Sequence, residues 1–177
     1  LIDDRPAGIA ASMARALTGM VATLTELTPD LVLLLGDRFE IFAVAQAALL
    51  CRVPIAHLCG GDVTEGAWDD ALRHGISKMA QLHFPSNEEA GRRLRQLGER
   101  DDRIHVVGSP GIDALQRLTL LDERELEAAL GFTLRPRNVL VTFHPETLSL
   151  GDGLAEQRAL LSALDAFGSE LGVILTM

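Results

Sequence analysis

The sequence is short of positive charge. Lys and Arg number 16 against 25 Asp and Glu, which gives a formal net charge of −9 and a pI near 4.9. No basic field is present to collect the phosphates of a nucleic acid or the headgroups of an anionic membrane, so we expect neither as a partner. A phosphorylated small molecule would have to be held locally, by a few arginine side chains and by helix N-termini.

Cysteines and long apolar runs are also scarce. Cys51 and Cys59 form no C-x-x-C motif and no disulfide framework, which indicates a reduced, cytoplasmic setting. The longest apolar stretch, residues 41–51, is broken by Gln46 and is too short to span a bilayer. No signal peptide is visible. The 177 residues are nevertheless 47% hydrophobic, which is enough to bury a core.

The spacing of apolar residues alternates between two periods along the first two thirds of the chain. Helical spacing predicts helices over residues 7–27, 41–51, 68–80 and 87–97. Short apolar or extended runs predict strands over 31–35, 53–58, 81–84 and 104–107. The run 31–35 is entirely apolar, which is typical of a strand covered on both faces. This order predicts an α/β fold, a doubly wound parallel sheet with helices on both faces.

The pattern changes after Pro110. Residues 112–130 are helix formers with no strand, and a second strand–helix series then runs to the end of the chain. We therefore divide the chain into a first α/β unit over 1–111, a connecting helical segment over 112–137 and the start of a second α/β unit over 138–177. A two-stranded sheet is not independently stable, so we expect a partial chain or one that completes its fold with a partner.

Polar residues gather just beyond the predicted strands, at the edge where open parallel sheets bind ligands. Asp37 follows the run 31–35 and is predicted to cap the next helix. Arg38 puts a cation where an anionic ligand would meet that helix N-terminus.

A second group follows the strand 53–58. Gly60 and Gly61 permit close backbone approach to a ligand, and Asp62 places a carboxylate beside it; the alternative is a tight loop with solvated acids. His57 is better explained as a satisfied core histidine than as a catalytic group. Cys59 has no surroundings that would activate a thiolate.

A third group lies on the helix 68–80. Asp69 and Arg73 are spaced i,i+4, as are Asp70 and His74, so each pair shares a helix face. The alternative is two ordinary surface ion pairs. A metal site at Asp70 and His74 would need more ligands than this spacing offers, and we predict none.

A fourth group follows the strand 138–143. His144 and Pro145 make a rigid turn that carries a titratable group, which is more typical of a functional site than of packing. His83 and His105 lie inside predicted strands, and we interpret both as structural.

These segments, in this order, resemble the UDP-N-acetylglucosamine 2-epimerase family, most closely its hydrolysing branch, which supplies N-acetylmannosamine for sialic acid synthesis. The resemblance runs from about residue 31 to 147. Its motifs are Leu35-Gly-Asp-Arg-Phe-Glu40, His57-x-x-Gly-Gly-Asp62, Asp69-Asp-x-x-Arg-His74 with Ile76-Ser-Lys78, Gly108-Ser-Pro110 and Phe143-His-Pro-Glu-Thr147. It implies the GT-B arrangement, in which two Rossmann-like domains face each other across a cleft, with parts of both domains lying outside this chain.

The resemblance also implies roles for single residues. Asp37 and Asp69 match catalytic acid/base residues of the family, and His144 matches a catalytic histidine from the second domain. Many members have a glutamate where this chain has Cys59, and Asp62 is our candidate to replace it. The residues expected to bind substrate are Arg38, Gly60, Gly61, Asp70, Arg73 and Ser109.

The function implied is conversion of UDP-N-acetylglucosamine to N-acetylmannosamine and UDP through a glycal, with no cofactor and no metal, by a homo-oligomer that takes a UDP-sugar. The Gly-Asp-Arg-Phe-Glu and Phe-His-Pro-Glu-Thr segments favour the hydrolysing branch. Three alternatives stay open: a non-hydrolysing epimerase, an enzyme for UDP-diacetamido-trideoxy sugars, and an inactive sugar-nucleotide-binding module. We expect this chain alone to have little or no turnover.

Overall fold

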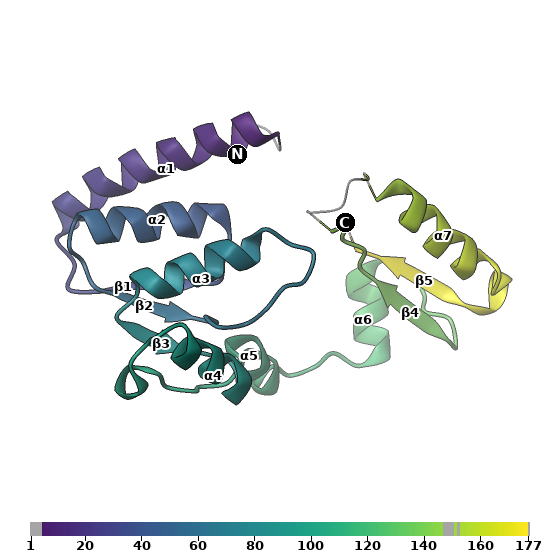
Figure 1. The fold of residues 1–177 in the computed structure, drawn as a ribbon. Coiled ribbons are helices and arrows are strands. Elements are labelled where there is room, and N and C mark those ends of the chain that lie inside the picture. The colour runs from purple at the N-terminus through teal and green to yellow at the C-terminus, as the bar shows by residue number, and fades with distance from the viewer. Residues whose placement is uncertain (1–4, 147–150, 152, 177) are drawn as a thin grey trace. The chain divides into compact units, whose positions relative to one another are not determined.

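Two parallel sheets form the framework of the chain (Figure 1). The computed structural model describes residues 5–146, 151 and 153–176, and the chain divides into two compact units, residues 1–116 and 117–177. The first unit holds a sheet of order β1-β2-β3, with bounds Val32–Leu35, Ile55–Leu58 and Leu82–Phe84. The second holds the parallel pair β4 and β5, Asn138–Val141 and Gly172–Leu175. The parallel α/β architecture predicted from the sequence is confirmed.

Four helices of the first unit follow the predicted pattern. They are α1 (Pro6–Leu27), α2 (Phe39–Leu50), α3 (Asp69–Met79) and α4 (Glu88–Gln96). Helix α1 has proline at its first position and ends where Thr28 turns left-handed before Pro29, which disfavours a further helical residue. Helix α4 is capped by Asn87, whose Oδ1 accepts the Ala90 N–H at 2.9 Å.

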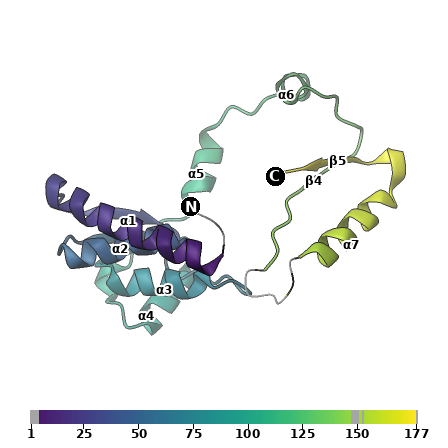
Figure 2. The same cartoon turned by 90° about the horizontal axis from the view of Figure 1, so that it is seen from above.

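The core of the first unit lies between the sheet and the helices α1, α2 and α3, which lie over it in Figures 1 and 2. Leu34 of β1 and Ile55 of β2 point into this layer. Four alanines of α2 are fully buried, namely Ala43, Ala45, Ala47 and Ala48. Their small side chains let the neighbouring helices approach closely. At the α2–α3 contact, a Cβ on Gly75 would lie 2.8 Å from the Phe42 ring, so a glycine is required there.

Helix α1 has the length and mean hydropathy, 1.3 over its apolar window, of a helix that could cross a membrane. It lies side by side with α2 instead (Figures 1 and 2). Leu17, Met20 and Val21 pack against the core cluster, and Leu24 is 5% exposed. The apolar face of α1 therefore has a partner within the first unit.

The prediction that strand β1 is covered on both faces is wrong. Leu34 is 4% exposed, but its neighbours Leu33 and Leu35 are 63% and 57% exposed. Within the part of the chain that the structure describes, β1 lies at one edge of the sheet, and the layer of α1, α2 and α3 covers only the face that carries Leu34. Among the described residues, the apolar run therefore has one buried and one open face.

Residues 104–107, predicted as a strand, form a single bridge between Ile104 and His83. The His105 N–H still donates to the His83 carbonyl at 2.9 Å, and the Val107 N–H donates to the Pro85 carbonyl at 3.1 Å. The ladder stops because β3 ends at Phe84 and the next residue, Pro85, has no N–H to donate. The segment runs beside β3 in extended form without becoming a regular strand.

The connecting segment forms two separate helices, α5 (Pro110–Arg117) and α6 (Glu123–Leu130). The boundary between the units falls within α5, five residues beyond the division at 111/112. Helix α6 begins with a capping box between Asp122 and Glu125 and ends at Gly131 in the left-handed region. Helix α7 (Leu154–Asp165) joins β4 to β5. Short 3₁₀ turns occupy Asp101–Arg103 and Gly168–Glu170.

The two faces of β1 differ in burial, so substitutions on each face should differ in their effect on stability. Leu34→Ala should lower the free energy of unfolding by about 2–5 kcal/mol, because it leaves a cavity in the core. Leu33→Ala, one residue away on the open face, should cost less than about 1 kcal/mol. Urea unfolding followed by circular dichroism measures both. Equal losses would show that β1 is covered on both faces.

Candidate functional site

The carboxyl ends of β1, β2 and β3 meet at one edge of the first sheet, as parallel pairing requires. Three chain segments follow these strands: Gly36–Asp37 after β1, the loop 59–64 after β2, and Ser86–Asn87 after β3. Helix α3 begins after the second segment. Three of the four groups of candidate residues therefore belong to this edge and its loops.

Arg73 of α3 lies at the centre of this edge. The residue is 6% exposed. Its guanidinium pairs with the Asp37 carboxylate and donates to the Thr64 Oγ1 at 2.7 Å and to the Asp62 carbonyl at 2.9 Å. Asp70 lies 3.5 Å from the same group. One buried cation thus joins the β1–α2 turn, the β2–α3 loop and its own helix.

The pairing of Asp37 differs from the sequence prediction. Arg38 occupies the N-cap position of α2, and no side chain caps that helix. The Asp37 carboxylate pairs with the buried Arg73 guanidinium instead, which balances a buried positive charge. Arg38 is paired with Glu40 at 3.1 Å and lies over the Phe39 ring, with its side chain 69% exposed.

Asp69, the first residue of α3, is not the ion-pair partner of Arg73 that the i,i+4 spacing predicted, since the carboxylates that Arg73 pairs with are Asp37 and Asp70. Burial raises the pKa of the Asp69 carboxyl, and the negative charge of Asp37 raises it further, against the lowering effect of Arg38 and Arg73. Two neighbouring carboxylates therefore sit in different electrostatic environments.

Trp68, directly before Asp69, stacks on Phe39 at the start of α2, with ring centroids 6.3 Å apart. This stack joins the N-terminal ends of α2 and α3. It was not anticipated from the sequence.

Asp70 supports the β2–α3 loop. Its Oδ1 accepts the Thr64 N–H at 3.1 Å, and its Oδ2 lies 3.5 Å from the His74 Nε2, as the i,i+4 spacing predicted. Across the described ranges, no group of three His, Cys, Asp or Glu side chains is placed to hold a metal ion.

Asp62 is held by the start of α4. Its carboxylate accepts from the Ser86 Oγ at 3.1 and 3.2 Å and from the Asn87 Nδ2 at 3.3 Å. Arg93, further along α4, donates to the Gly61 carbonyl at 3.0 Å. Sequence reasoning missed these three partners. The cap pattern of Asn87 before two glutamates was a visible signal, but nothing local linked it to Asp62.

Gly60 and Gly61 lie against other residues of the protein, where a side chain would not fit. A Cβ on Gly60 would lie 2.8 Å from both His57 Nδ1 and Ser77 Oγ. Gly61 has a φ of +83°, and a Cβ there would collide with the Ala90 carbonyl oxygen. Packing therefore accounts for both glycines without a ligand.

Cys59 has a φ of 59°, and its N–H donates to the Phe84 carbonyl at 3.0 Å. Burial raises the pKa of its thiol, and the charge of Asp62 adds to that effect. The thiol is therefore protonated at neutral pH, which agrees with the expectation that it is not an activated nucleophile.

The remaining candidates, Ser109 and His144, belong to other segments of the chain. Ser109 precedes α5, and its carbonyl accepts the Ile112 and Asp113 N–H groups. His144 belongs to the second unit and is exposed at a hollow of about 270 Å³ between the end of β4 and the start of α7, with Glu146 and Glu156 also in its lining. Thr147, the last residue of that motif, lies outside the described residues.

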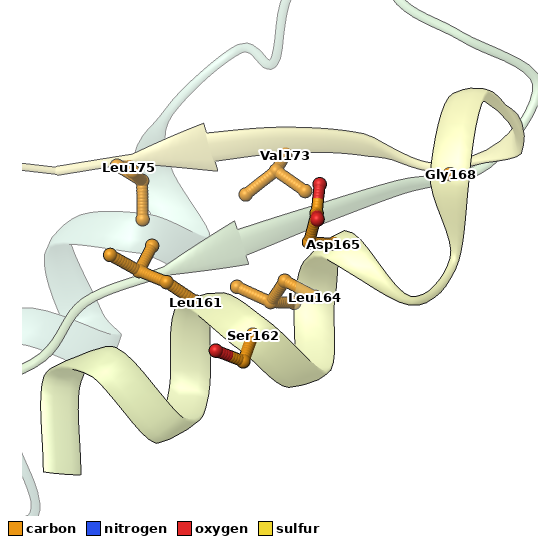
Figure 3. A pocket seen from close by; sticks show the side chains of 7 residues that line it. All are labelled: Leu161, Ser162, Leu164, Asp165, Gly168, Val173 and Leu175. Atoms are coloured by element: carbon orange, nitrogen blue, oxygen red, sulfur yellow. The ribbon is translucent and has the colours of Figure 1, made fainter.

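A larger hollow of about 500 Å³ lies between α7 and β5 (Figure 3). Its lining is mostly aliphatic, with Leu161, Leu164, Val173 and Leu175 pointing into it and Asp165 at its side. It contains none of the candidate residues.

The sequence model of UDP-N-acetylglucosamine 2-epimerases matches residues 1–177. The chain belongs to the UDP-N-acetylglucosamine 2-epimerase family. It is 40% identical over 165 residues to a Campylobacter jejuni protein named GDP/UDP-N,N'-diacetylbacillosamine 2-epimerase (hydrolyzing), a match that covers 93% of this chain and 43% of the relative. It is 42% identical over 140 residues to the polysialic acid biosynthesis protein P7 of Escherichia coli, covering 79% of this chain and 36% of the relative.

A solved structure of a Neisseria meningitidis UDP-GlcNAc 2-epimerase bound to UDP-GlcNAc has a TM-score of 0.80 to this chain at 24% identity. The match covers 92% of this chain and 46% of that one. This likeness confirms the fold class expected from the sequence, an α/β chain of the GT-B-like type. The chain spans less than half the length of each of these three relatives.

The electrostatic coupling of the two carboxylates gives a direct prediction. Asp37→Asn should lower the pKa of Asp69, because it removes a negative charge that opposes ionisation of Asp69. In the wild type the Asp69 pKa lies above its unfolded value, so ionisation of Asp69 weakens folding as the pH rises through that range. The variant should lose the part of this penalty that comes from the Asp37 charge and keep the part that comes from burial. Carboxyl ¹³C NMR titration measures the pKa.

Asp102→Asn is the matched control, since Asp102 pairs with Arg100 on the surface and should leave the Asp69 titration unchanged. An Asp69 pKa that stays fixed or rises in Asp37→Asn would contradict this electrostatic account.

Proposed function

We propose that the whole protein is a hydrolysing 2-epimerase that converts UDP-N-acetylglucosamine to UDP and N-acetylmannosamine. The observation that carries the proposal is the cluster at the sheet edge, in which Arg73 holds Asp37 while the nearby Asp69 has a raised pKa. The similarity to two proteins named as hydrolyzing 2-epimerases, at 40% and 37% identity, supports this branch over the non-hydrolysing one.

The reaction needs carboxylates because the hydrogen at C2 of the sugar is barely acidic. If the bond from C1 to the diphosphate oxygen breaks first, its electron pair leaves with UDP and C1 becomes an oxocarbenium-like cation. Anionic side chains stabilise that cation, and one of them takes the C2 proton to leave a glycal. Water then adds its oxygen to C1, and a carboxylic acid returns a proton to C2 from the opposite face.

The environments of the acids suggest how these roles divide. Asp37, paired with Arg73, is the anion that stabilises the cationic sugar or takes its C2 proton. Asp69, whose pKa burial raises, is suited to return a proton as an acid. Asp62, held by Ser86 and Asn87, takes the place of the glutamate that many family members have at the position of Cys59.

The leaving diphosphate needs positive charge. Arg73 is enclosed by protein partners, so we assign it a positioning role in place of the substrate contact expected from the sequence. Arg38 stands exposed beside the uncapped N-terminus of α2 and is the better candidate cation at this edge. His144 would hydrogen-bond or protonate the leaving oxygens. Assembly of the whole protein into a homo-oligomer stays a prediction.

A second substrate class is favoured by a specific observation. Two relatives that are 40% and 37% identical to this chain are named for UDP-N,N'-diacetylbacillosamine, a sugar that also carries a 4-acetamido group. The chemistry at C1 and C2 is the same for both sugars, so the same three acids would serve either substrate.

Proton NMR of the products tests the proposal. The whole protein, given UDP-N-acetylglucosamine, should release N-acetylmannosamine and free UDP. UDP-N-acetylmannosamine as the stable product would place the protein in the non-hydrolysing branch. A kcat/KM for UDP-N,N'-diacetylbacillosamine more than about tenfold higher would assign the second substrate class. No turnover of either sugar would contradict the proposal.

A further inference from the structure

His57 connects the turn that carries Asp37 to helix α3. The residue is fully buried, with a relative exposure of 0%. Its Nε2 lies 2.8 Å from the Gly36 carbonyl oxygen, and its Nδ1 lies 3.0 Å from the Ser77 Oγ. Both ring nitrogens therefore have partners, one on the β1–α2 turn and one on α3.

The partners determine which nitrogen carries the proton. A carbonyl oxygen can only accept, so the Nε2–H donates to Gly36. Burial lowers the pKa of His57, which keeps the ring neutral, and Nδ1 therefore accepts the Ser77 hydroxyl proton.

Ser77 and Arg73 are four residues apart on α3, and both are buried. One face of α3 therefore contacts two neighbouring residues of the β1–α2 turn. Arg73 binds the Asp37 carboxylate directly, and Ser77 is linked to the Gly36 carbonyl through His57. Gly36 has a φ of +84°, a left-handed conformation that the carbonyl contact fixes in place.

The β2–α3 loop is built around this connection. A Cβ at Gly60 would lie 2.8 Å from both His57 Nδ1 and Ser77 Oγ. A side chain there would break the hydrogen bond between them. The sequence suggested that Gly60 lets a ligand approach the backbone; in the structure, Gly60 leaves the space that the His57–Ser77 hydrogen bond needs.

We propose that His57 is a positioning residue that fixes the Asp37 carboxylate for the reaction by anchoring the Gly36 carbonyl to α3. The role in the reaction rests on the proposed function. An apolar residue would fill the same buried space without the two hydrogen bonds, and it would leave the Gly36 carbonyl without this partner. The turn that carries Asp37 would then be held through Arg73 and through the Gly36 N–H, which donates to the Leu58 carbonyl at 3.3 Å, but not through the Gly36 carbonyl.

Two substitutions separate positioning from packing. His57→Phe keeps an aromatic ring, somewhat larger than imidazole, and removes both hydrogen bonds, whereas the Nε2 amide of His57→Gln can still donate to Gly36. In the whole protein, His57→Phe should lower kcat by roughly tenfold to a hundredfold with KM changed less than about threefold, because a misplaced group slows the chemical step. His57→Gln should recover most of that loss.

His83 provides the matched control. It is equally buried, on β3 directly opposite His57, and its Nε2 bonds Glu99 and not the turn. His83→Phe should lower stability and leave kcat within about twofold of the wild type. Equal kcat losses in the two Phe variants, or wild-type kcat in His57→Phe, would overturn the positioning role.

Two NMR measurements on this chain do not depend on turnover. The ¹⁵N signals of the wild-type ring should show the neutral Nε2–H tautomer of His57. The Gly36 carbonyl ¹³C and Asp37 amide signals should match the wild type in His83→Phe and shift in His57→Phe, because the His57 Nε2 lies against the Gly36 carbonyl whereas the His83 Nε2 lies against Glu99. An Nδ1–H tautomer, or unchanged Gly36 and Asp37 signals in His57→Phe, would overturn the inference even if turnover is observed. If the NMR results hold and no UDP-sugar is turned over, the proposed function fails and the anchoring of the turn stands.

Discussion

The ion pair between Arg73 and Asp37 is the constraint on which the candidate site depends. A buried guanidinium is costly unless its N–H groups all have acceptors, and in this chain the acceptors come from three separate segments. Satisfying Arg73 therefore fixes the β1–α2 turn and the β2–α3 loop relative to helix α3. The position of Asp37 and the path of the loop that carries Asp62 follow from this one requirement.

The same pair gives the two carboxylates different surroundings. Asp37 is balanced by a cation, while burial and the Asp37 charge raise the pKa of Asp69. The roles proposed for the two acids rest on this difference. Gly60 and Gly61 bring the loop close enough to α3 and α4 for Asp62 to be held at the same sheet edge.

Local patterns in the sequence predicted most elements of the fold. The helices 7–27 and 87–97 and the strand that follows the first of them were readable because proline, asparagine and apolar spacing act over a few residues. The exposed face of β1 could not be predicted in this way, since it depends on which strand lies at the edge of the sheet. The short ladder at 104–107 could not be predicted either, since it depends on Pro85 of a neighbouring segment. For the candidate site, the sequence pointed to the residues but did not predict which side chains pair with each other. Asp37 is 36 residues from Arg73, and the helical spacing pointed to Asp69 instead.

A double-mutant cycle on Asp37 and Arg73 tests this account most directly. The free energy of unfolding of this chain would be measured for Asp37→Asn, Arg73→Gln and the double variant. The account predicts a coupling energy of about 1–3 kcal/mol, as expected for residues in one buried network. A coupling below about 0.5 kcal/mol, the size typical of exposed ion pairs, would show that the pair does not organise the site.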